Sequence, residues 1–427
     1  MAHDAAVPAS LRPPTATVEQ RGVFYSSARW TPDTLAWLAR HLRTRGQESL
    51  EQLPDDAILA AWSDTVEAFL DSGSPERQAL DASLQRLCQL SQAGLEAGLQ
   101  AVLGGVRREV ASPLLRQATS WNEEHGKGSL VLVILAANLP ALAVQPLLPA
   151  LLLRRPIVLK SPTSEPLFAP AFVEALTQRL PELSAALAAI TWPGGDTVLE
   201  APLLEATERV LAYGEAATID DLEARAPHKV FAYGPKTSLA ILGSDVEPSS
   251  IAAGLARDIA LFDQRGCLSV QAIYTAGDAT ALATALAEHL QRVAAEWPPG
   301  PIDPVVAAGV QQLRSEATMR GLVMPELPLA SGTVVVEPQT RFQPAPGLRT
   351  VRIHPLTGLA TLPEILAEWA GQLQGAALAG VEALALQAAL EELGISRCTA
   401  PGELQNPDAT WHNGGVHPFT ALTVGTV

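Results

Sequence analysis

The residue with the clearest capacity for chemistry is Cys267, a single thiol on a short polar turn. A helix-period segment at 251–262 and the turn Asp-Gln-Arg-Gly at 263–266 precede it, and a strand-like run at 270–274 follows. Nucleophiles are usually displayed in this way, on a turn between two rigid elements. Arg265 and the N–H groups of the turn are expected to lower the pKa of the thiol. The alternative is a small buried hydrophobe, as unpaired cysteines commonly are.

Three further candidates each stand at the end of a run that reads as a buried strand. Asn138 follows the apolar run 130–136, Lys160 closes the run 156–160, and Gly214 follows the run 209–213. Ligands of open parallel sheets bind at the carboxyl ends of strands, where all three are expected to lie. Asn138 is either an amide donor for a developing oxyanion or a turn residue bonded to its own backbone. Lys160 is either a cation that meets a ribose or phosphate, or an exposed lysine at a strand end.

Several common signatures are absent from the sequence. No GxGxxG follows a strand-like run, so the usual dinucleotide fingerprint is missing, and the lack of GxSxG argues against an α/β-hydrolase. Neither a CxxC pair nor HExxH occurs, so no metal site is predicted. His412 and His417 lie in polar, glycine-containing surroundings, where histidines are more often structural than catalytic.

Composition predicts a cytoplasmic protein without a membrane span. The formal net charge of -16 is poorly suited to binding nucleic acid or an anionic membrane. Three scattered cysteines form no disulfide framework, and the N-terminus lacks the features of a secretory signal. The apolar stretch 130–153 is long enough to cross a bilayer. Because three prolines interrupt it, a buried strand, a turn and a buried helix are the better interpretation.

The elements that must position these residues fall into four segments. Residues 1–30 are Pro/Ala-rich and predict a flexible tail, and residues 31–122 predict helices, one of them over 75–103. From residue 129, buried strands alternate with helices, which is typical of an α/β domain with a parallel sheet. Cys267 belongs to a second set of helices and strands. The final apolar segment 421–427 is β-prone and would suit pairing with the sheet edge of a partner in a homodimer.

These pieces, taken in order, resemble the aldehyde dehydrogenase superfamily. The resemblance rests on Asn138, then VLKSP at 158–162, AYG at 212–214 and the turn cysteine. Within the superfamily the chain is most similar to the LuxC-like acyl-CoA reductases. That closer similarity is carried by DQRGCLSVQ at 263–271, FAYGPKTSLAIL at 231–242 and RCTAPGELQNPDATWHNG at 397–414. It covers the chain from about residue 129 to the end.

The resemblance implies a fold and a set of residue roles. The fold would be α/β and aldehyde dehydrogenase-like. A helical region with a Rossmann-like cofactor domain would span 31–240, a catalytic cysteine domain 241–398, and a tail returning to the active site or a sheet edge 399–427. Cys267 would be the nucleophile, and Asn138 with the Cys267 N–H the oxyanion hole. Lys160, Ser161 and Gly214 would line the nicotinamide dinucleotide site, and His412 would be a tail contact near the active site.

Two departures from the family pattern bear on the reaction. Aldehyde-oxidising relatives carry a glutamate general base where this chain reads Phe-Ala-Tyr-Gly at 231–234, and no carboxylate stands there. A thioacyl-enzyme would then persist until hydride arrives. Glu215, next to Gly214, would disfavour a nearby pyrophosphate and is expected to face a ribose or point away.

The resulting prediction is reduction of a fatty acyl thioester, carried by coenzyme A or an acyl-carrier protein, to the aldehyde. NADPH is favoured over NADH because Lys160 would lie near the adenine ribose. The alternatives are an aldehyde dehydrogenase that works in the oxidative direction and a non-catalytic scaffold of the same fold.

Overall fold

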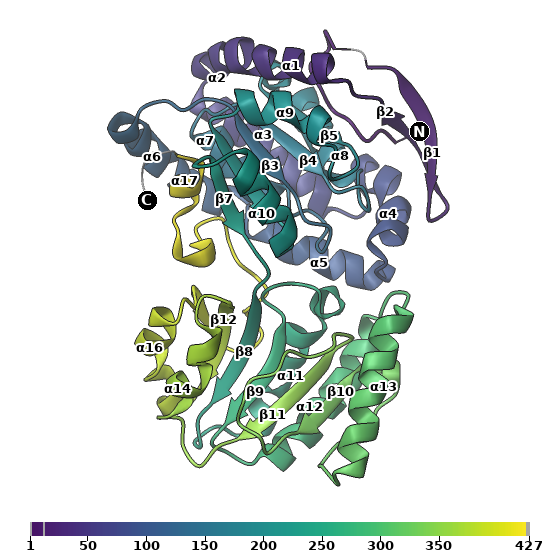
Figure 1. Cartoon of the computed structure of the whole chain (residues 1–427), viewed down its shortest axis with the longest axis vertical. Coiled ribbons are helices and arrows are strands. Elements are labelled where there is room, and N and C mark those ends of the chain that lie inside the picture. Colours follow the sequence, from purple (N-terminus) through teal and green to yellow (C-terminus); the bar gives the residue numbers. More distant parts are fainter. Residues whose placement is uncertain (1, 12, 424–427) are drawn as a thin grey trace.

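The computed structural model describes residues 2–11 and 13–423, and its framework is a pair of parallel sheets, one in each half of the molecule (Figure 1). The first sheet has the strand order β5-β4-β3-β6-β7, and every neighbouring pair is parallel. Its strands are β3 (Val131–Ile134), β4 (Ile157–Ser161), β5 (Leu187–Thr191), β6 (Arg209–Tyr213) and β7 (Val230–Tyr233).

The second sheet has the order β10-β11-β9-β8-β12-β13 and is also parallel throughout. Its strands are β8 (Thr237–Leu242), β9 (Val270–Thr275), β10 (Thr333–Val336), β11 (Thr350–Pro355), β12 (Leu373–Ala379) and β13 (Arg397–Thr399). The α/β class predicted from the alternating pattern is confirmed. β12 was not predicted, because its sequence LQGAALA is rich in alanine, which favours helices over strands.

Helices cover both sheets. Those of the first half are α1 (Pro32–His41), α2 (Gln47–Gln52), α3 (Asp55–Leu70), α4 (Pro75–Cys88), α5 (Gln92–Gly104), α6 (Arg108–His125), α7 (Val144–Leu152), α8 (Phe168–Arg179), α9 (Thr197–Ala206) and α10 (Ala216–Arg225). Those of the second half are α11 (Pro248–Ala260), α12 (Ala279–Glu296), α13 (Pro304–Met319), α14 (Leu362–Leu366), α15 (Val381–Leu384) and α16 (Gln387–Glu392). The single helix predicted over 75–103 is instead two helices. Gln89 adopts a left-handed φ of 51° that ends α4, and Ser91 caps the start of α5.

The first sheet is buried on both faces, as its nearly continuous apolar strands predict. Because side chains alternate along a strand, Val131, Val133 and Leu211 join one core with α3, α7 and α8. Leu132 and Val210 join a second core with α1 and α9 on the opposite face. A ligand at the edge of this sheet would therefore meet different helices on the two faces.

The first thirty residues differ from the flexible tail that was predicted. β1 (Thr15–Gln20) and β2 (Val23–Ala28) form an antiparallel hairpin. Ala6 bridges to Ala189 on the edge strand β5. Asp4 is buried and accepts hydrogen bonds from the Ala28 N–H at 2.9 Å and the Ser27 hydroxyl at 2.6 Å. Composition alone missed this segment because its backbone is satisfied by pairing with distant strands.

The segment after β13 crosses back from the second half to the first. The Ala409 N–H donates to the Gly105 carbonyl at 2.8 Å, next to the end of α5. Helix α17 (Pro418–Leu422) follows, and Arg209 donates to the Ala421 carbonyl at 2.9 Å. Residues 421 and 422, predicted as the start of a strand, are thus helical, and residues 424–427 of that prediction lie outside the described residues.

Candidate active site

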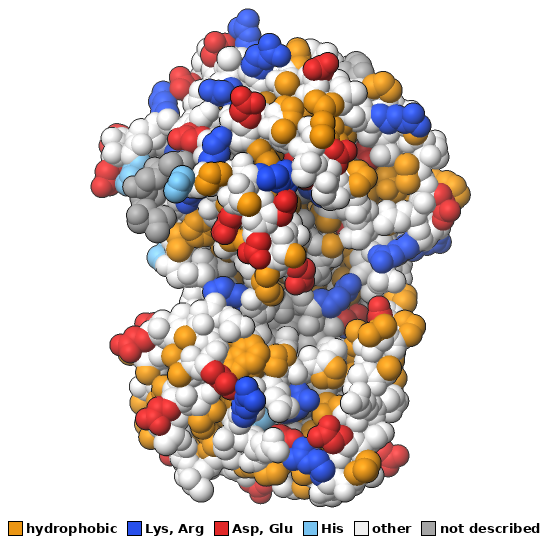
Figure 2. Space-filling view, viewed as in Figure 1, with side chains coloured by type: hydrophobic (Ala, Val, Ile, Leu, Met, Phe, Trp, Pro, Cys, Tyr) orange, Lys and Arg blue, Asp and Glu red, His pale blue; other side chains and the backbone are white. Residues whose placement is uncertain are grey.

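Cys267 lies on the turn between α11 and β9, where the two halves of the molecule meet. The molecule narrows at this junction (Figure 2). Three consecutive residues before the cysteine, Phe262, Asp263 and Gln264, have left-handed φ values of 56°, 51° and 64°. Residues with side chains avoid this region, so the turn is strained and must be held by its surroundings.

Two side chains of the turn anchor it to the second half. The Gln264 amide donates to the carbonyls of Val270 at 2.8 Å and Thr350 at 2.7 Å, and accepts from the Thr350 N–H at 2.8 Å. The Asp263 carboxylate pairs with Arg349 at 2.7 Å and accepts from the Gly300 N–H at 3.0 Å. The buried Gln264 bonds and the charge-assisted Asp263 bonds together can hold a backbone that local preferences disfavour.

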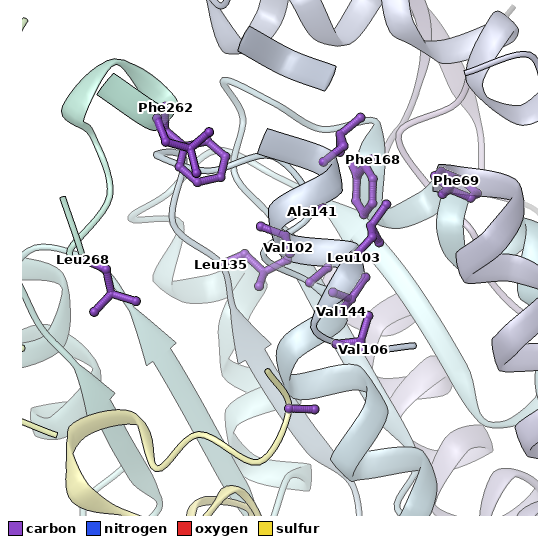
Figure 3. Close-up of a cluster of buried hydrophobic side chains, with 14 of the residues drawn as sticks. Phe69, Val102, Leu103, Val106, Leu135, Ala141, Val144, Phe168, Phe262 and Leu268 are labelled. Carbon is purple, nitrogen blue, oxygen red and sulfur yellow. The ribbon is translucent and has the colours of Figure 1, made fainter. Parts of the chain in front are cut away.

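Phe262 fixes the turn to the helical layer of the first half. Its ring packs on Gly98 of α5 so closely that a Cβ at this glycine would overlap it. Figure 3 shows the ring directed toward the apolar cluster that contains Val102 and Leu103 of the same helix. The helical N-terminal third, which carried no sequence motif, therefore supports the cysteine turn.

Asn138 reaches the same turn from the loop between β3 and α7. Its Nδ2 donates to the Arg265 carbonyl at 3.2 Å, two residues before the cysteine. The next residue, Leu139, lies beside Gly266. An asparagine amide has two N–H groups, so one remains for another acceptor, and Oδ1 is buried without a partner among the described residues. Residues that are 129 positions apart in sequence are thus brought to one turn.

The electrostatic surroundings of Cys267 differ from those predicted. The residue is half-buried, and desolvation of its sulfur raises the pKa of the thiol to about 11. The backbone N–H groups of Cys267 and Leu268, and the charge of Lys236, act in the opposite direction and lower that pKa.

The prediction that Arg265 lowers the pKa of the thiol is wrong. The Arg265 guanidinium donates to the carbonyls of Cys88 at 2.7 Å and Phe262 at 3.0 Å, so it is directed toward the end of α4. The cation that acts on the thiol belongs instead to Lys236, in the linker between β7 and β8. Lys236 is visible in sequence only as one of four lysines.

Lys160 is the second-last residue of β4 and is buried at 7% exposure. Its Nζ lies 5.7 Å from the centre of the Trp192 ring. Burial lowers the pKa of Lys160, while Glu200 raises it. Within the described residues no carboxylate lies within ion-pair distance of this cation. Trp192, which follows β5 and donates to Glu200 at 3.0 Å, is a residue that the sequence did not single out.

Ser161 and Gly214 lie at the carboxyl ends of β4 and β6, the two strands that flank β3. Ser161 is buried, and its Oγ has no partner among the described residues. Around Gly214, a Cβ would meet nothing closer than Thr218 at 3.7 Å. Glu215 is exposed at the start of α10.

Two tyrosines lie at the carboxyl ends of β6 and β7. The rings of Tyr213 and Tyr233 stack at 4.5 Å, and burial and the nearby Cys267 keep the pKa of Tyr213 well above its usual range. Tyr213 therefore faces the cysteine as a neutral phenol. The stretch 231–234, in which oxidative relatives would carry a carboxylate, forms the end of β7 and contributes aromatic rings instead.

His412 is exposed in the C-terminal segment. Its ring lies 5.2 Å from that of His417, which in turn stacks on Trp121 of α6 at 5.5 Å. The ring contact of His412 is thus with His417 of the same segment, and His417 in turn links the segment to α6. Its role near the active site stays a prediction.

A groove of about 780 Å³ runs along α5 beside the cysteine turn. Small residues at helical spacing line one side of it: Ala93, Ala97, Ala101 and Gly105. Leu261 and Trp297 add apolar surface, and the rest of the lining includes the charged side chains Glu96, Arg257, Glu296 and Asp408. Ala97 is the neighbour of Gly98, and Leu261 is the neighbour of Phe262, so the groove borders the contact that holds the turn.

Among the helices in the described part of the chain, none has the length and hydropathy of a membrane span.

Comparison with known proteins adds a family. The profile described as acyl-CoA reductase (LuxC) matches residues 57–424. A long-chain acyl-protein thioester reductase from Photorhabdus laumondii is 28% identical over 204 residues, which are 47% of this chain and 42% of the relative. A protein of the same name from Vibrio harveyi is 28% identical over 210 residues, covering 48% and 43%. The matched part of the chain thus spans less than half the length of these curated relatives.

Solved structures share the fold at low identity. A salicylaldehyde dehydrogenase from Pseudomonas putida G7 complexed with salicylaldehyde is 12% identical with a TM-score of 0.71, over 98% of this chain and 93% of that chain. An aldehyde dehydrogenase from Pseudomonas syringae with NAD+ and octanal is 11% identical with a TM-score of 0.69, covering 96% and 92%. The aldehyde dehydrogenase-like architecture expected from the sequence is confirmed.

Proposed function

The chain belongs to the acyl-CoA reductase (LuxC) family, and we propose that it reduces a fatty acyl thioester to the aldehyde through a thioacyl intermediate on Cys267. The acyl donor would be acyl-CoA or acyl-carrier protein. The observation that carries the proposal is the bond from the Asn138 amide to the cysteine turn at 3.2 Å. This bond ties Asn138, the proposed oxyanion donor, to the turn that carries Cys267, the proposed nucleophile, and so supports their acting together.

The residues at the turn divide the work of acylation. The Cys267 thiolate attacks the thioester carbonyl, and the remaining Asn138 N–H and the Cys267 N–H donate to the tetrahedral oxyanion. One such donor is typically worth about 3–4 kcal/mol. The carrier thiol then leaves. Because 231–234 holds no carboxylate, no general base at that position activates water against the thioacyl group.

The first half has features that fit a nicotinamide dinucleotide. Lys160 is a buried cation without an ion pair among the described residues, and the buried Ser161 Oγ has no hydrogen-bond partner among them. Both would gain partners from a ribose or phosphate, and the open space at Gly214 would admit the cofactor backbone. When bound, the cofactor supplies the hydride that reduces the thioacyl carbonyl. Lys160 favours NADPH over NADH, since a 2′-phosphate would provide its missing counter-charge.

The acyl chain is assigned to the groove along α5. Its small residues leave room for a linear chain, and Leu261 and Trp297 would give part of that chain apolar contact. The groove borders the turn that carries Cys267 and lies apart from Lys160, which is on the α9 side of the first sheet. The two substrates could therefore approach the cysteine from different directions.

A pair of cysteine variants tests the proposal. Cys267→Ala should abolish acyl-CoA-dependent oxidation of NADPH, measured by loss of absorbance across a series of acyl lengths, while NADPH binding persists. Cys398→Ala is the matched control, since Cys398 is also half-buried but belongs to β13, and it should retain activity. Substantial turnover in the Cys267 variant would refute the mechanism.

Two alternatives make different predictions in simple assays. An oxidative aldehyde dehydrogenase would form carboxylate from aldehyde and NAD(P)+ without coenzyme A, whereas the proposed enzyme needs a thiol acceptor in that direction. A non-catalytic scaffold would leave Cys267 unreactive toward both acyl-CoA and a thiol label.

A further inference from the structure

Acylation needs the Cys267 thiolate, and burial of the sulfur disfavours formation of that anion. Burial raises the pKa of the thiol to about 11, so little thiolate exists at neutral pH in the free enzyme. The stretch 231–234 offers no carboxylate base, and Arg265 faces the end of α4. A different group must offset the negative charge that appears at the sulfur.

We propose that Lys236 is the fixed positive charge that stabilises the Cys267 thiolate. Lys236 acts on the sulfur through its charge and does not contact it in the structure, which makes it a positioning residue for the anion. The inference rests on the proposed function, because it presumes that Cys267 is the nucleophile. The thiol itself can nevertheless be tested without any substrate.

Sheet topology places the two residues together. Lys236 lies one residue before β8, and Cys267 three residues before β9, and these strands are parallel neighbours with Ser238 paired to Val270. Both therefore lie at the same edge of the second sheet, which faces the junction. The Ser238 hydroxyl donates to the Cys267 carbonyl at 2.8 Å and fixes the strand start to the cysteine turn.

A hydrogen bond to the backbone holds the Lys236 ammonium in place. Nζ donates to the Gly371 carbonyl at 2.9 Å, in the loop before β12. This bond uses one of three N–H groups and stops a half-buried side chain from turning out into solvent. A charge that is already fixed stabilises a developing anion without having to reorganise.

The interaction is reciprocal, and among the described residues Lys236 is the cation that acts on the thiol. The charge of Lys236 lowers the pKa of Cys267, and Cys267 raises the pKa of Lys236 against the effect of burial. The other titratable group that faces the thiol is Tyr213 on β6, which stays neutral. Arg265, on the cysteine turn itself, has its guanidinium bonded to the Cys88 carbonyl.

Alkylation of Cys267 by iodoacetamide measures this effect directly. The rate would be followed from pH 7 to 10 on the full chain, with peptide mass spectrometry separating Cys267 from the other two cysteines. Lys236→Met should slow alkylation at pH 8 at least tenfold, because a rise of one unit in the pKa of the thiol lowers the thiolate fraction about tenfold. Lys236→Arg keeps the charge and should stay within about threefold of the parent protein.

Lys229→Met is the matched control, since Lys229 also donates to backbone carbonyls, those of Leu204 and Glu205. It should leave the alkylation profile unchanged. An unchanged profile in Lys236→Met would overturn the proposal, and so would equal slowing in the Met and Arg variants, which would point to the Gly371 bond instead. Equal slowing in the Lys229 variant would also overturn it, because the alkylation rate would then depend on the net charge of the protein and not on Lys236. None of these results depends on whether an acyl thioester is the substrate.

Discussion

At the scale of single residues, the proposed active site consists of Cys267 and Asn138, and the surroundings of the cysteine act on its pKa in opposite directions. Burial disfavours the Cys267 thiolate, whereas the turn N–H groups and Lys236 favour it. Asn138 donates one N–H to the Arg265 carbonyl, and this bond orients the amide toward the turn. Strain at three consecutive left-handed residues is maintained because each side chain has its own anchor.

Asn138→Ala should lower turnover with acyl-CoA roughly 100-fold, because it removes a preorganised donor to the oxyanion. Steady-state NADPH oxidation under saturating substrate measures this. Asn122→Ala is a matched control, since Asn122 on α6 also donates to a distant carbonyl, that of Leu153, and has a buried Oδ1 without a partner. Its turnover should remain near that of the parent. An Asn138 variant with full activity would return this residue to the role of a turn asparagine.

At the scale of elements, α5 serves two sites with adjacent residues. Gly98 receives the Phe262 ring and supports the turn, while Ala97 lines the groove assigned to the acyl chain. The helix starts at the Ser91 cap and ends beside Gly105, where a Cβ would overlap the Pro407 carbonyl. Its small residues are therefore required by close contacts on two sides.

Gly98→Ala should displace Phe262 and with it the cysteine turn. Overpacking of this kind typically costs about 1–3 kcal/mol, so we expect a lower melting temperature together with slower turnover. Gly358→Ala, in the loop before α14, meets no atom within 4 Å and should leave both quantities unchanged. Thermal unfolding followed by circular dichroism measures the melting temperature, and the NADPH assay measures turnover. Parent-like stability and activity in Gly98→Ala would contradict the role given to this contact.

Ala97→Trp should fill the groove and alter selectivity for acyl length. We expect kcat/KM to fall at least tenfold for long-chain acyl-CoA and much less for acetyl-CoA, because only a long chain would occupy the groove. Gln92→Trp, on the exposed side of α5, controls for the added indole. Equal losses for short and long substrates would place the acyl chain elsewhere.

At the scale of the whole molecule, two chain crossings join the sheets. The linker 234–236 leads from β7 into β8, and the segment after β13 returns to the first half. Arg155 and Arg209 hold this returning segment by donating to the carbonyls of Leu422 and Ala421, both at 2.9 Å. The geometry of the proposed active site depends on both halves, because Asn138 comes from the first and Cys267 from the second.

The sequence predicted the parts of this architecture that depend on local pattern. Buried strands at 131–134 and 157–161 followed from continuous apolar runs, and the strand-end positions of Asn138 and Lys160 followed from those strands. Contacts between distant segments could not be read in this way. The hairpin at 15–28, the packing of Gly98 on Phe262 and the direction of Arg265 each depend on a partner remote in sequence. The raised pKa of Cys267 likewise follows from burial, which a polar turn sequence conceals.

The most direct test of the central claim is to trap the acyl-enzyme. The full chain would be incubated with a long-chain acyl-CoA in the absence of cofactor, and the peptide that contains Cys267 examined by mass spectrometry. The proposed function predicts an acyl mass added at Cys267 that is stable toward water and discharged as aldehyde when NADPH is added. Failure to acylate Cys267, or release of free fatty acid at the same rate with and without NADPH, would contradict it.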